Sequence, residues 1–437
     1  MKVLKFGGTS VGKPERMHQV AKLITTDTNR KIVVLSALSG TTNTLVAISE
    51  TMKINDEGAG SRLLKELHEH YNQFKDVLLQ DESQRKVAGS IIEEHFSFIS
   101  SLQNRKYTEA INKELLAQGE LLSTKLFYTY LQEKNIKSKL LSALDFMYID
   151  EDKEPDLDYI ETELRKVLEE NRDIDLFITQ GFICVNHLGA VDNLKRGGSD
   201  YSASLIGAAI RAEEVQIWTD IDGMHNNDPR IVDKTFPIAE LSFDEAAELA
   251  YFGAKILHPS SIWPAQKFNI PVSLKNTMEP HAHGTIIRGE SKMNGIKAIA
   301  AKDNITAIKI KSSRMLLAYG FLRRVFEIFE KYKNPIDMIT TSEVAISLTI
   351  DDDKFLDNIV RELNEFGVVT IDRDQTIICI VGDFVVENRG IVKKVFDSLS
   401  DIPLRMISYG GSRHNISLLI QSHLKKETLQ SLNNGLF

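Results

Sequence analysis

An internal repeat in the C-terminal third of the chain restricts the possible fold more than any other feature. The segment GFLRRVFEIFEKYKNPIDMITTSEVAISLTI begins at Gly320, and GIVKKVFDSLSDIPLRMISYGGSRHNISLLI begins at Gly390. Both copies predict the order strand, helix, strand, strand, helix. Apolar residues at every second position of the first copy predict a strand with one buried face: Val344, Ile346, Leu348 and Ile350. Two such α+β units can share one sheet, and the repeat alone leaves ligand binding and a purely structural duplication equally open.

The chain before the repeat alternates between strand-like and helical segments. Short apolar runs predict strands over residues 3–6, 31–36, 175–179 and 215–218, and small and apolar residues predict a helix over 201–211. Residues 60–133 have a long, charged, helical pattern, which suits a lid, a regulatory element or a plain helical cover. The alternation predicts an α/β fold with a mostly parallel sheet between helices.

Turn-forming residues mark the expected domain limits. Ser242 and Glu245 form a capping box that predicts a helix start, and prolines interrupt the chain from residue 259 to residue 280. We place a boundary around residues 285–296. The expected domains are 1–290, followed by two α+β repeats over 296–372 and 373–437, which are free to interleave.

Composition excludes several classes of function. The 437 residues carry a net charge of −8, which argues against a general nucleic-acid partner, because phosphate contacts need a positive surface. Cys184 and Cys379 both lie in apolar runs and are expected to be buried, reduced thiols. No signal peptide or membrane-spanning run is seen, so we expect a cytoplasmic protein without membrane contact.

The segment KFGGTSVGK, residues 5–13, suggests a phosphate contact close to the N-terminus. Its lysine precedes the glycines, so it is not a Walker loop, and it also lacks the Gly-x-Gly-x-x-Gly dinucleotide pattern. Lys5 ends a strand, and Gly7 and Gly8 allow backbone amides to approach an anion closely. An ordinary strand-to-helix turn remains an alternative.

Three further segments combine glycine with charged residues. KRGGSDYSAS (195–204) places an arginine before a helix N-terminus, which suits an anion, although a solvated arginine and a capping aspartate are the plainer interpretation. IWTDIDGMHNNDPR (217–230) suits a nucleotide or an ordinary turn, and YFGAKILHP (251–259) adds a lysine. Together these segments suit phosphoryl transfer, in which the protein positions groups and neutralises charge. A carboxylate acceptor would need no general base, because it is already ionised at neutral pH.

The motifs in this order closely resemble the aspartokinases of the amino acid kinase superfamily. The matching stretches are Lys5-Phe-Gly-Gly-Thr-Ser-Val11, Val34-Leu-Ser-Ala37, Gln118-Gly-Glu120, Arg196-Gly-Gly-Ser-Asp-Tyr201, Trp218-Thr-Asp220, Asp228-Pro-Arg230 and Phe252-Gly-Ala-Lys-Ile-Leu-His-Pro259. The repeat resembles the tandem regulatory ACT domains of that family. The resemblance implies ATP- and Mg²⁺-dependent phosphorylation of the L-aspartate side chain to 4-phospho-L-aspartate, the first step toward lysine, threonine and methionine.

The resemblance also implies a role for individual residues. The catalytic set is Lys5, Gly8, Asp200 and Lys255. The aspartate-binding set is Thr42, Glu120, Arg196, Gly197, Gly198 and Ser199, in which Glu120 would pair with the α-ammonium and Arg196 with the α-carboxylate. The ATP-binding set is Lys5, Gly7, Gly8, Thr219, Asp220, His225, Arg230 and Lys255, with no metal-binding residue assigned. Two positions depart from the family pattern: Lys195 replaces a glycine, and His225 replaces a common tyrosine.

The regulatory half resembles the lysine-responsive branch of the family. The residues that match its effector site are Met315, Asp337, Thr341, Ser342 and Glu343. The resemblance therefore implies feedback inhibition by L-lysine and a homodimer or higher homo-oligomer. No dehydrogenase region follows the repeat, so we expect the monofunctional form. Two alternatives remain: a kinase for another small amino acid, and a non-catalytic ACT-domain amino acid sensor.

Overall fold

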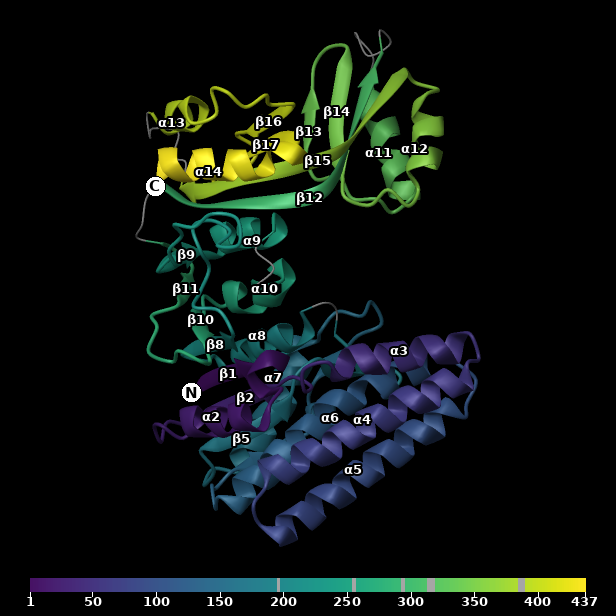
Figure 1. Ribbon diagram of the computed structural model, residues 1–437, viewed down its shortest axis with the longest axis vertical. Helices are drawn as coiled ribbons and strands as arrows, with labels where there is room; N and C mark the ends of the chain where they lie inside the picture. The colour runs from purple at the N-terminus through teal and green to yellow at the C-terminus, as the bar shows by residue number, and fades with distance from the viewer. Residues whose placement is uncertain (195–196, 254–256, 292–294, 313–318, 384–389) are drawn as a thin grey trace. The chain divides into compact units, whose positions relative to one another are not determined.

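The computed structural model divides the chain into two compact units, and each is described by itself (Figure 1). The residues that the structure describes are 1–194, 197–253, 257–291, 295–312, 319–383 and 390–437. The first unit comprises residues 1–224, 239–243 and 257–290, and the second comprises the described parts of 225–238, 244–256 and 291–437. Two segments of the expected first domain therefore pack with the second unit.

The first unit is built on an eight-stranded sheet in the order β3-β5-β2-β1-β8-β10-β11-β9. Every neighbouring pair is parallel except β10 and β11, which confirms the expected mostly parallel α/β sheet. The strands are β1 (Lys2–Phe6), β2 (Lys31–Leu35), β3 (Lys139–Leu140), β5 (Leu176–Gln180), β8 (Glu214–Thr219), β9 (Glu240–Ser242), β10 (Val272–Asn276) and β11 (Thr285–Arg288). A small separate sheet contains β4 (Tyr148–Ile149), β6 (Ile183–Asn186) and β7 (Val191–Asn193).

Helices cover this sheet, as the apolar character of its strands requires. Residues 32–35 of β2 are fully buried, which is typical of a parallel strand covered on both faces. The helices are α1 (Gly8–Val11), α2 (Pro14–Ile24), α3 (Thr41–Lys53), α4 (Glu57–Leu78), α5 (Glu82–Gln103), α6 (Glu109–Glu133), α7 (Leu157–Glu170), α8 (Gly198–Ile210) and α10 (Pro259–Lys267), with a 3-10 turn at Ala143–Asp145. No described helix is both long and apolar enough to cross a bilayer.

The expected helical stretch 60–133 consists of α4, α5 and α6. Their first turns are capped by Asp56, Asp81 and Thr108, whose side-chain oxygens each accept a backbone N–H three residues later. Tyr71, Phe74 and Phe96 from these helices share one hydrophobic core with strands β1 and β2. The stretch is therefore part of the main core, and α6 also supplies a residue to the site described below.

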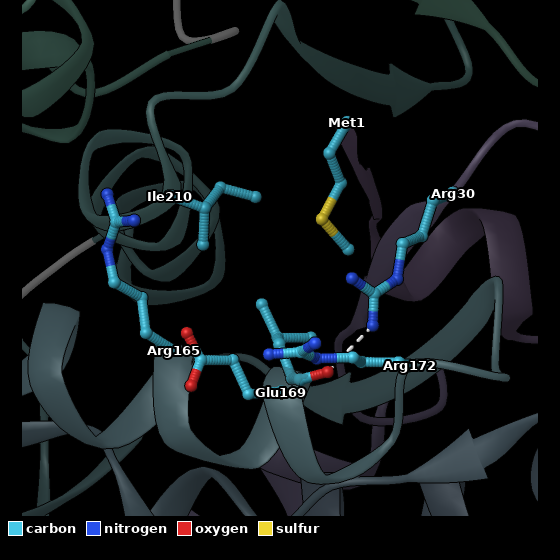
Figure 2. A pocket seen from close by; sticks show the side chains of 7 residues that line it. Met1, Arg30, Arg165, Glu169, Arg172 and Ile210 are labelled. Carbon is cyan, nitrogen blue, oxygen red and sulfur yellow. Dashed lines mark hydrogen bonds between the residues drawn. The ribbon is translucent and has the colours of Figure 1, made fainter.

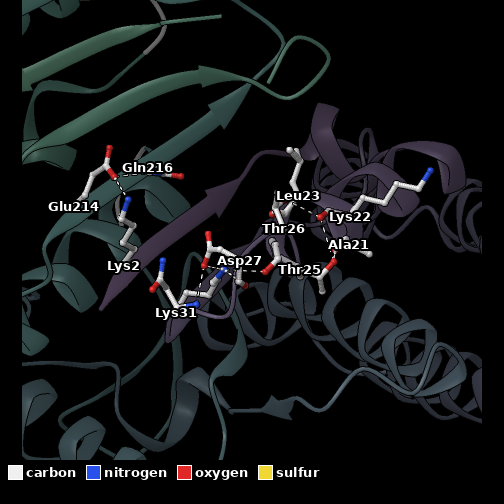
Figure 3. Close-up of polar contacts among 12 residues, drawn as sticks. Lys2, Ala21, Lys22, Leu23, Thr25, Thr26, Asp27, Lys31, Glu214 and Gln216 are labelled. Atoms are coloured by element: carbon white, nitrogen blue, oxygen red, sulfur yellow. Dashed lines mark hydrogen bonds and ion pairs between the residues drawn. The ribbon is translucent and has the colours of Figure 1, made fainter. Parts of the chain in front are cut away.

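Charged residues at the starting edge of the sheet have structural partners. The ammonium group of Lys31 binds Asp27 at 2.8 Å and the carbonyl of Ile24 at 3.0 Å, and Lys2 pairs with Glu214 at 3.1 Å (Figure 3). A cavity of about 290 Å³ near this edge is lined by Met1, Arg30, Arg165, Leu168, Glu169, Arg172 and Ile210 (Figure 2). Its Arg30 guanidinium donates to backbone carbonyls, among them that of Leu168 at 2.8 Å. None of the predicted site residues lines this cavity.

The second unit contains a six-stranded antiparallel sheet in the order β13-β14-β12-β15-β17-β16. Its strands are β12 (Gly295–Lys311), β13 (Ile339–Thr341), β14 (Ala345–Ile350), β15 (Val368–Asp383), β16 (Met406–Tyr409) and β17 (Asn415–Gln421). Its helices are α9 (Phe243–Tyr251), whose first residue belongs to the first unit, α11 (Phe321–Lys331), α12 (Leu356–Leu363), α13 (Ile391–Asp397) and α14 (Lys425–Leu436), with a 3-10 turn at Ser422–Leu424. This order reproduces the predicted layout of each repeat.

Two hydrophobic cores correspond to the two repeats. Ile308 and Ile310 of β12 pack with α11 and α12, whereas Ile299, on the same strand, packs with α13 and α14. The two long strands β12 and β15 therefore serve both repeats. In β14, Ile346, Leu348 and Ile350 are fully buried as predicted, but Val344 precedes the strand and is 42% exposed.

Candidate active site

The described residues among the predicted phosphate and substrate residues of the first unit meet at the carboxyl edge of its parallel strands. β1 ends after Lys5 and Phe6, β2 leads into Ser36 and Ala37, and β8 ends at Thr219. Because β5, β2, β1, β8 and β10 are parallel, their carboxyl ends lie side by side, which is where ligands bind in open α/β sheets. The fold explains why residues far apart in the sequence form one candidate site.

Lys5 pairs with Asp200, which lies in the first turn of α8. The ammonium nitrogen is 2.7 Å from Asp200 Oδ1, and the two side chains are only 11% and 14% exposed. A Cβ atom added at Gly7 would lie 3.2 Å from the Lys5 nitrogen, so glycine leaves the backbone open beside this cation. The structure thus brings together a cation, a bare backbone segment and a helix N-terminus, all of which favour an anion.

Glu120 is a buried carboxylate from the middle of α6. Its Oε1 accepts the backbone N–H of Ala37 at 3.3 Å, and in the described residues its Oε2 has no hydrogen-bond partner. The side chain is nearly inaccessible, and burial raises the pKa of Glu120 from 4.5 to about 8, although the Ala37 hydrogen bond acts in the opposite direction. A buried carboxyl group with one unused oxygen is suited to bind a cationic ligand.

Ser199 connects the start of α8 to the end of β2. Its hydroxyl accepts a hydrogen bond from Ser36 Oγ at 2.9 Å. The helix begins after Gly197, whose φ of 79° lies in the left-handed region that glycine favours. Ser36 lies in the motif Val34-Leu-Ser-Ala37, but no role was predicted for it. Its position directly after the buried strand β2 is the sequence signal that could have identified it as a site residue.

Gly181, directly after β5, sets the position of Ser199. A Cβ atom added there would lie 2.6 Å from both Cβ and Oγ of Ser199. We expect Gly181→Ala to push the start of α8 away from the site and to lower kcat/KM for the substrate about 10-fold, with a stability cost of about 1–3 kcal/mol. Steady-state kinetics and thermal unfolding measure the two effects.

Gly58→Ala, in α4, is the matched control. Apart from the backbone of its own helix and its chain neighbours, the nearest atom to the added Cβ would be Asp56 Oδ1, at 3.7 Å. This variant should leave the kinetics unchanged and stabilise the helix slightly. Equal kinetics for Gly181→Ala and Gly58→Ala would show that the contact with Ser199 does not matter.

The remaining predicted residues fall into three groups. Thr219 and Asp220 belong to the first unit, where the Thr219 hydroxyl donates to Asp220 at 3.2 Å, and Thr42 lies at the half-buried start of α3. His225 and Arg230 belong to the second unit. The predictions for Lys195, Arg196, Lys255 and Met315 fall outside the described residues.

Arg230 faces an open, basic cavity in the second unit. Its guanidinium forms two hydrogen bonds with the carboxylate of Asp228, at 2.9 and 2.7 Å, and is otherwise 81% exposed. The cavity has a volume of about 410 Å³, and its lining residues are Arg230, Ile231, Asp233, Ser422, His423, Lys425, Lys426 and Gln430. His225 Nδ1 lies 3.0 Å from the hydroxyl of Thr235 in the same segment.

The four predicted effector residues that the structure describes lie around β13 in the first repeat. Thr341 ends β13, and Ser342 closes the turn to β14 through its N–H bond to the carbonyl of Ala345, at 2.8 Å. Glu343 is exposed at the tip of this turn, whereas the side chain of Asp337 has no exposed surface. Asp337 contacts Lys302 and Tyr251, two residues that sequence reasoning did not assign.

Comparison with known proteins identifies the family. The amino acid kinase family model matches residues 1–276, and an ACT domain model matches residues 378–436. The chain is 36% identical to aspartokinase 3, chloroplastic, of Arabidopsis thaliana and 33% identical to the lysine-sensitive aspartokinase 3 of Escherichia coli; both alignments span all of this chain, and 81% and 99% of those proteins.

Solved structures agree with this result. Escherichia coli aspartokinase III in complex with aspartate and ADP (R-state) is 32% identical, with a TM-score of 0.85 and full coverage of both chains. The same enzyme in complex with lysine and aspartate (T-state) is 33% identical, with a TM-score of 0.83 over all of this chain and 99% of that one. The matching sequence stretches, the parallel sheet, the ACT repeats and these relatives lead to one conclusion: the chain belongs to the aspartokinases of the amino acid kinase family.

Proposed function

We propose that this chain transfers the γ-phosphoryl group of ATP to the side-chain carboxylate of L-aspartate, giving 4-phospho-L-aspartate and ADP. The observation that carries the proposal is Glu120, a buried carboxyl group with an unused oxygen at the same sheet edge as the Lys5–Asp200 pair. A ligand with an ammonium group at one end and a carboxylate at the other fits between an acidic group and a cation. Aspartate has this arrangement of charges.

The substrate roles follow the charges of the site. Glu120 pairs with the α-ammonium, Arg196 with the α-carboxylate, and Ser199 and Thr42 lie beside the substrate. Gly197 and Gly198 form the start of α8, where backbone N–H groups favour anions. Lys5 and the backbone at Gly7 and Gly8 neutralise the transferring phosphoryl group, and Asp200 holds the Lys5 ammonium in place.

The nucleotide roles follow the predicted ATP-binding set. Thr219 and Asp220 contact ATP from the end of β8, and His225, Arg230 and Lys255 complete the set. Before Arg230 can contact a phosphate, its two hydrogen bonds to Asp228 must be replaced. The hydrogen bonds from that same arginine lower the pKa of Asp228 below its usual value, so Asp228 is a carboxylate at neutral pH.

Mg²⁺ suits this site as a partner of the nucleotide. The described residues contain no cluster of three or more His, Cys, Asp or Glu side chains that could hold a metal by themselves. Mg²⁺ in phosphoryl-transfer enzymes needs only one or two carboxylates in addition to phosphate oxygens, and Asp220 at the strand end is such a group. When bound, Mg²⁺ would neutralise phosphate charge.

We further propose that L-lysine inhibits the enzyme through Met315, Asp337, Thr341, Ser342 and Glu343, in a homodimer or higher homo-oligomer. We infer domain limits at 1–290, 296–372 and 373–437, with β12 shared between the two ACT repeats. The packing of Ile299 with α13 and α14 supports this sharing. Two buried free thiols, Cys184 and Cys379, support a reducing, cytoplasmic location.

The proposal is tested by measuring ADP release with aspartate or glutamate as the acceptor. We expect kcat/KM for aspartate to exceed that for glutamate by about 10-fold or more, because one extra methylene in a shaped site typically costs 10- to 200-fold. Hydroxylamine should trap the acyl phosphate as a hydroxamate. Addition of lysine, but not threonine, should inhibit the reaction.

Each alternative gives a different outcome. Equal or better turnover of glutamate would identify a kinase for another acid. Lysine binding without any turnover of either acid would identify a non-catalytic sensor. The retention of a nearly buried pair between Lys5, near the end of β1, and Asp200, at the start of α8, argues against that sensor.

A further inference from the structure

Helix α9 contacts the regulatory strands through one polar face. Three side chains of α9, each about one helical turn from the next, point to the two regulatory repeats: Glu245, Glu248 and Tyr251. Their partners lie on different elements: Lys297 at 2.6 Å, Asn415 at 2.5 Å and Asp337 at 2.7 Å, respectively. The first pair is only 1% exposed on either side, so the start of the helix is firmly held. The last contact, at Tyr251, involves a predicted effector residue.

The two oxygens of Asp337 differ in their surroundings. Oδ1 accepts the Tyr251 hydroxyl and the Lys302 ammonium, both at 2.7 Å. Oδ2 is buried and has no hydrogen-bond partner among the described residues. A buried carboxylate oxygen without a hydrogen bond costs free energy. A further hydrogen-bond donor therefore gains the most free energy by binding Oδ2 of Asp337.

The Lys302 ammonium forms ion pairs with two carboxylates, those of Asp337 and Asp351. Besides Asp337, its ammonium contacts Asp351 Oδ2 at 2.9 Å and lies 4.3 Å from the centre of the Tyr251 ring. Burial alone would lower the pKa of Lys302, but the hydrogen bonds to Asp337 and Asp351 raise it above its usual value. The pKa of Tyr251 is raised to about 12 by burial and by its bond to Asp337, so the hydroxyl stays a donor.

We propose that Tyr251 couples the effector site to the end of helix α9, which precedes the predicted ATP-binding residue Lys255 in the sequence: an effector ammonium binds Oδ2 of Asp337 and thereby changes the hydrogen bond that Oδ1 makes with Tyr251. This inference rests on the proposed function, because it uses Asp337 as an effector residue. It adds Tyr251 as a residue that does not contact the effector and determines how strongly its binding inhibits. Lys302 is the cation of the protein that competes with the effector ammonium for the carboxylate of Asp337.

The physical basis is competition for one carboxylate. A second ammonium on Asp337 repels Lys302, which has Asp351 as an alternative partner, and draws electron density from the acceptor of Tyr251. Tyr251 is the last residue of α9, and Lys255 follows it by four positions in the sequence. A change in the Tyr251 bond therefore acts on the end of α9. By linkage, ATP should alter lysine affinity by the factor by which lysine alters ATP affinity.

The test is Tyr251→Phe in the full chain, which removes the hydroxyl and keeps the ring over Lys302. We measure aspartate-dependent ADP release against lysine concentration, and lysine binding by calorimetry. We expect basal kcat and direct lysine affinity to stay within about threefold of wild type, whereas the largest inhibition that saturating lysine produces should be about 10-fold weaker. The factor by which ATP changes lysine affinity should fall toward one.

Tyr332→Phe is the matched control, because the Tyr332 hydroxyl also donates to a carboxylate of the first repeat, but this carboxylate is Glu362 of α12, at 2.5 Å, and not Asp337. It should be inhibited like wild type. Wild-type inhibition of Tyr251→Phe would overturn the inference and leave the proposed function intact. A wild-type chain that lysine neither binds nor inhibits would overturn the effector proposal, and this inference with it.

Discussion

Replacement of Lys5 by methionine is expected to lower kcat about 1000-fold or more, because loss of a cation aimed at transferring phosphoryl charge is among the largest single effects in such enzymes. Methionine keeps most of the apolar stem, so the strand should still pack. The ammonium is 2.7 Å from Asp200, and its removal leaves a nearly buried carboxylate without its partner. A loss of about 3–5 kcal/mol in stability is therefore expected as well. Single-turnover kinetics on the folded fraction separate the two effects.

Lys31→Met is the control that the fold offers. Lys31 is also nearly buried and also pairs with an aspartate, Asp27 at 2.8 Å, but it lies at the starting edge of the neighbouring strand β2. We expect this variant to melt at a lower temperature while its kcat per folded molecule stays close to wild type. If both variants lost the same fraction of activity, the effect of Lys5 would be one of stability, and its place in the reaction would be wrong.

The sequence predicted the part of the fold that depends on local pattern. Strand-like runs at 3–6 and 31–36 became β1 and β2 within one residue at each end, because fully buried strands have continuous apolar runs. The repeat gave the element order of both ACT units, because its helical and alternating patterns are also local. Val344 was misassigned to the buried face, since alternation does not reveal where a strand begins.

The site could be predicted only where the chemistry lies in one short segment. Lys5 and its glycines were visible as a strand end followed by bare backbone. Glu120 was not, because α6 is buried on several sides there and its hydrophobic pattern gives no sign of a functional face. Only the resemblance indicated it. The partners Asp200, Tyr251 and Lys302 depend on which strands and helices meet, and no local pattern contains that information.

The predicted ATP-binding set also shows a limit of sequence order. Four members of the set, from Thr219 to Arg230, lie in one continuous segment of the sequence. In the structure, residues 225–238 pack with the second unit, and Asn227 bonds to the carbonyl of Leu429 in α14 at 3.1 Å. The regulatory repeat thus holds the segment that carries His225 and Arg230. A regulatory domain that packs directly on predicted nucleotide residues has a physical means to influence them.

Replacement of Glu120 by glutamine is expected to lower kcat/KM for aspartate about 10- to 100-fold, because a neutral amide replaces the charged partner of the α-ammonium. The pH profile should change too. The pKa of Glu120 is about 8 without ligand, so kcat/KM of the wild type should rise with pH up to about 8 as the carboxyl group ionises. In the variant this rise should be absent. Kinetics from pH 6 to pH 9 measure both effects.

The raised pKa of Glu120 also predicts that the stability of the wild type falls with rising pH, whereas its kcat/KM rises. An acid whose pKa is raised by folding binds its proton more tightly in the folded state, so the folded protein loses stability as pH rises from about 4.5 to about 8. Glutamine does not carry this cost. Without aspartate at pH 8, Glu120→Gln should therefore melt at a higher temperature than wild type. Saturating aspartate should stabilise the wild type more than the variant, because its ammonium offsets the buried charge.

Glu133→Gln on the same helix separates this effect from a general response to losing a carboxylate. Glu133 is also poorly exposed, but it accepts hydrogen bonds from the backbone N–H groups of Gln80 and Asp81. Burial alone would raise the pKa of Glu133. The hydrogen bonds from Lys134, Asp81 and Gln80 outweigh burial, so the pKa is lowered. Its carboxylate therefore stabilises the fold at every pH above about 4.5, so Glu133→Gln should melt at a lower temperature at pH 8 and keep wild-type kinetics. If Glu120→Gln behaved like Glu133→Gln in both measurements, Glu120 would be a structural carboxylate, and the aspartate ammonium would have to bind elsewhere.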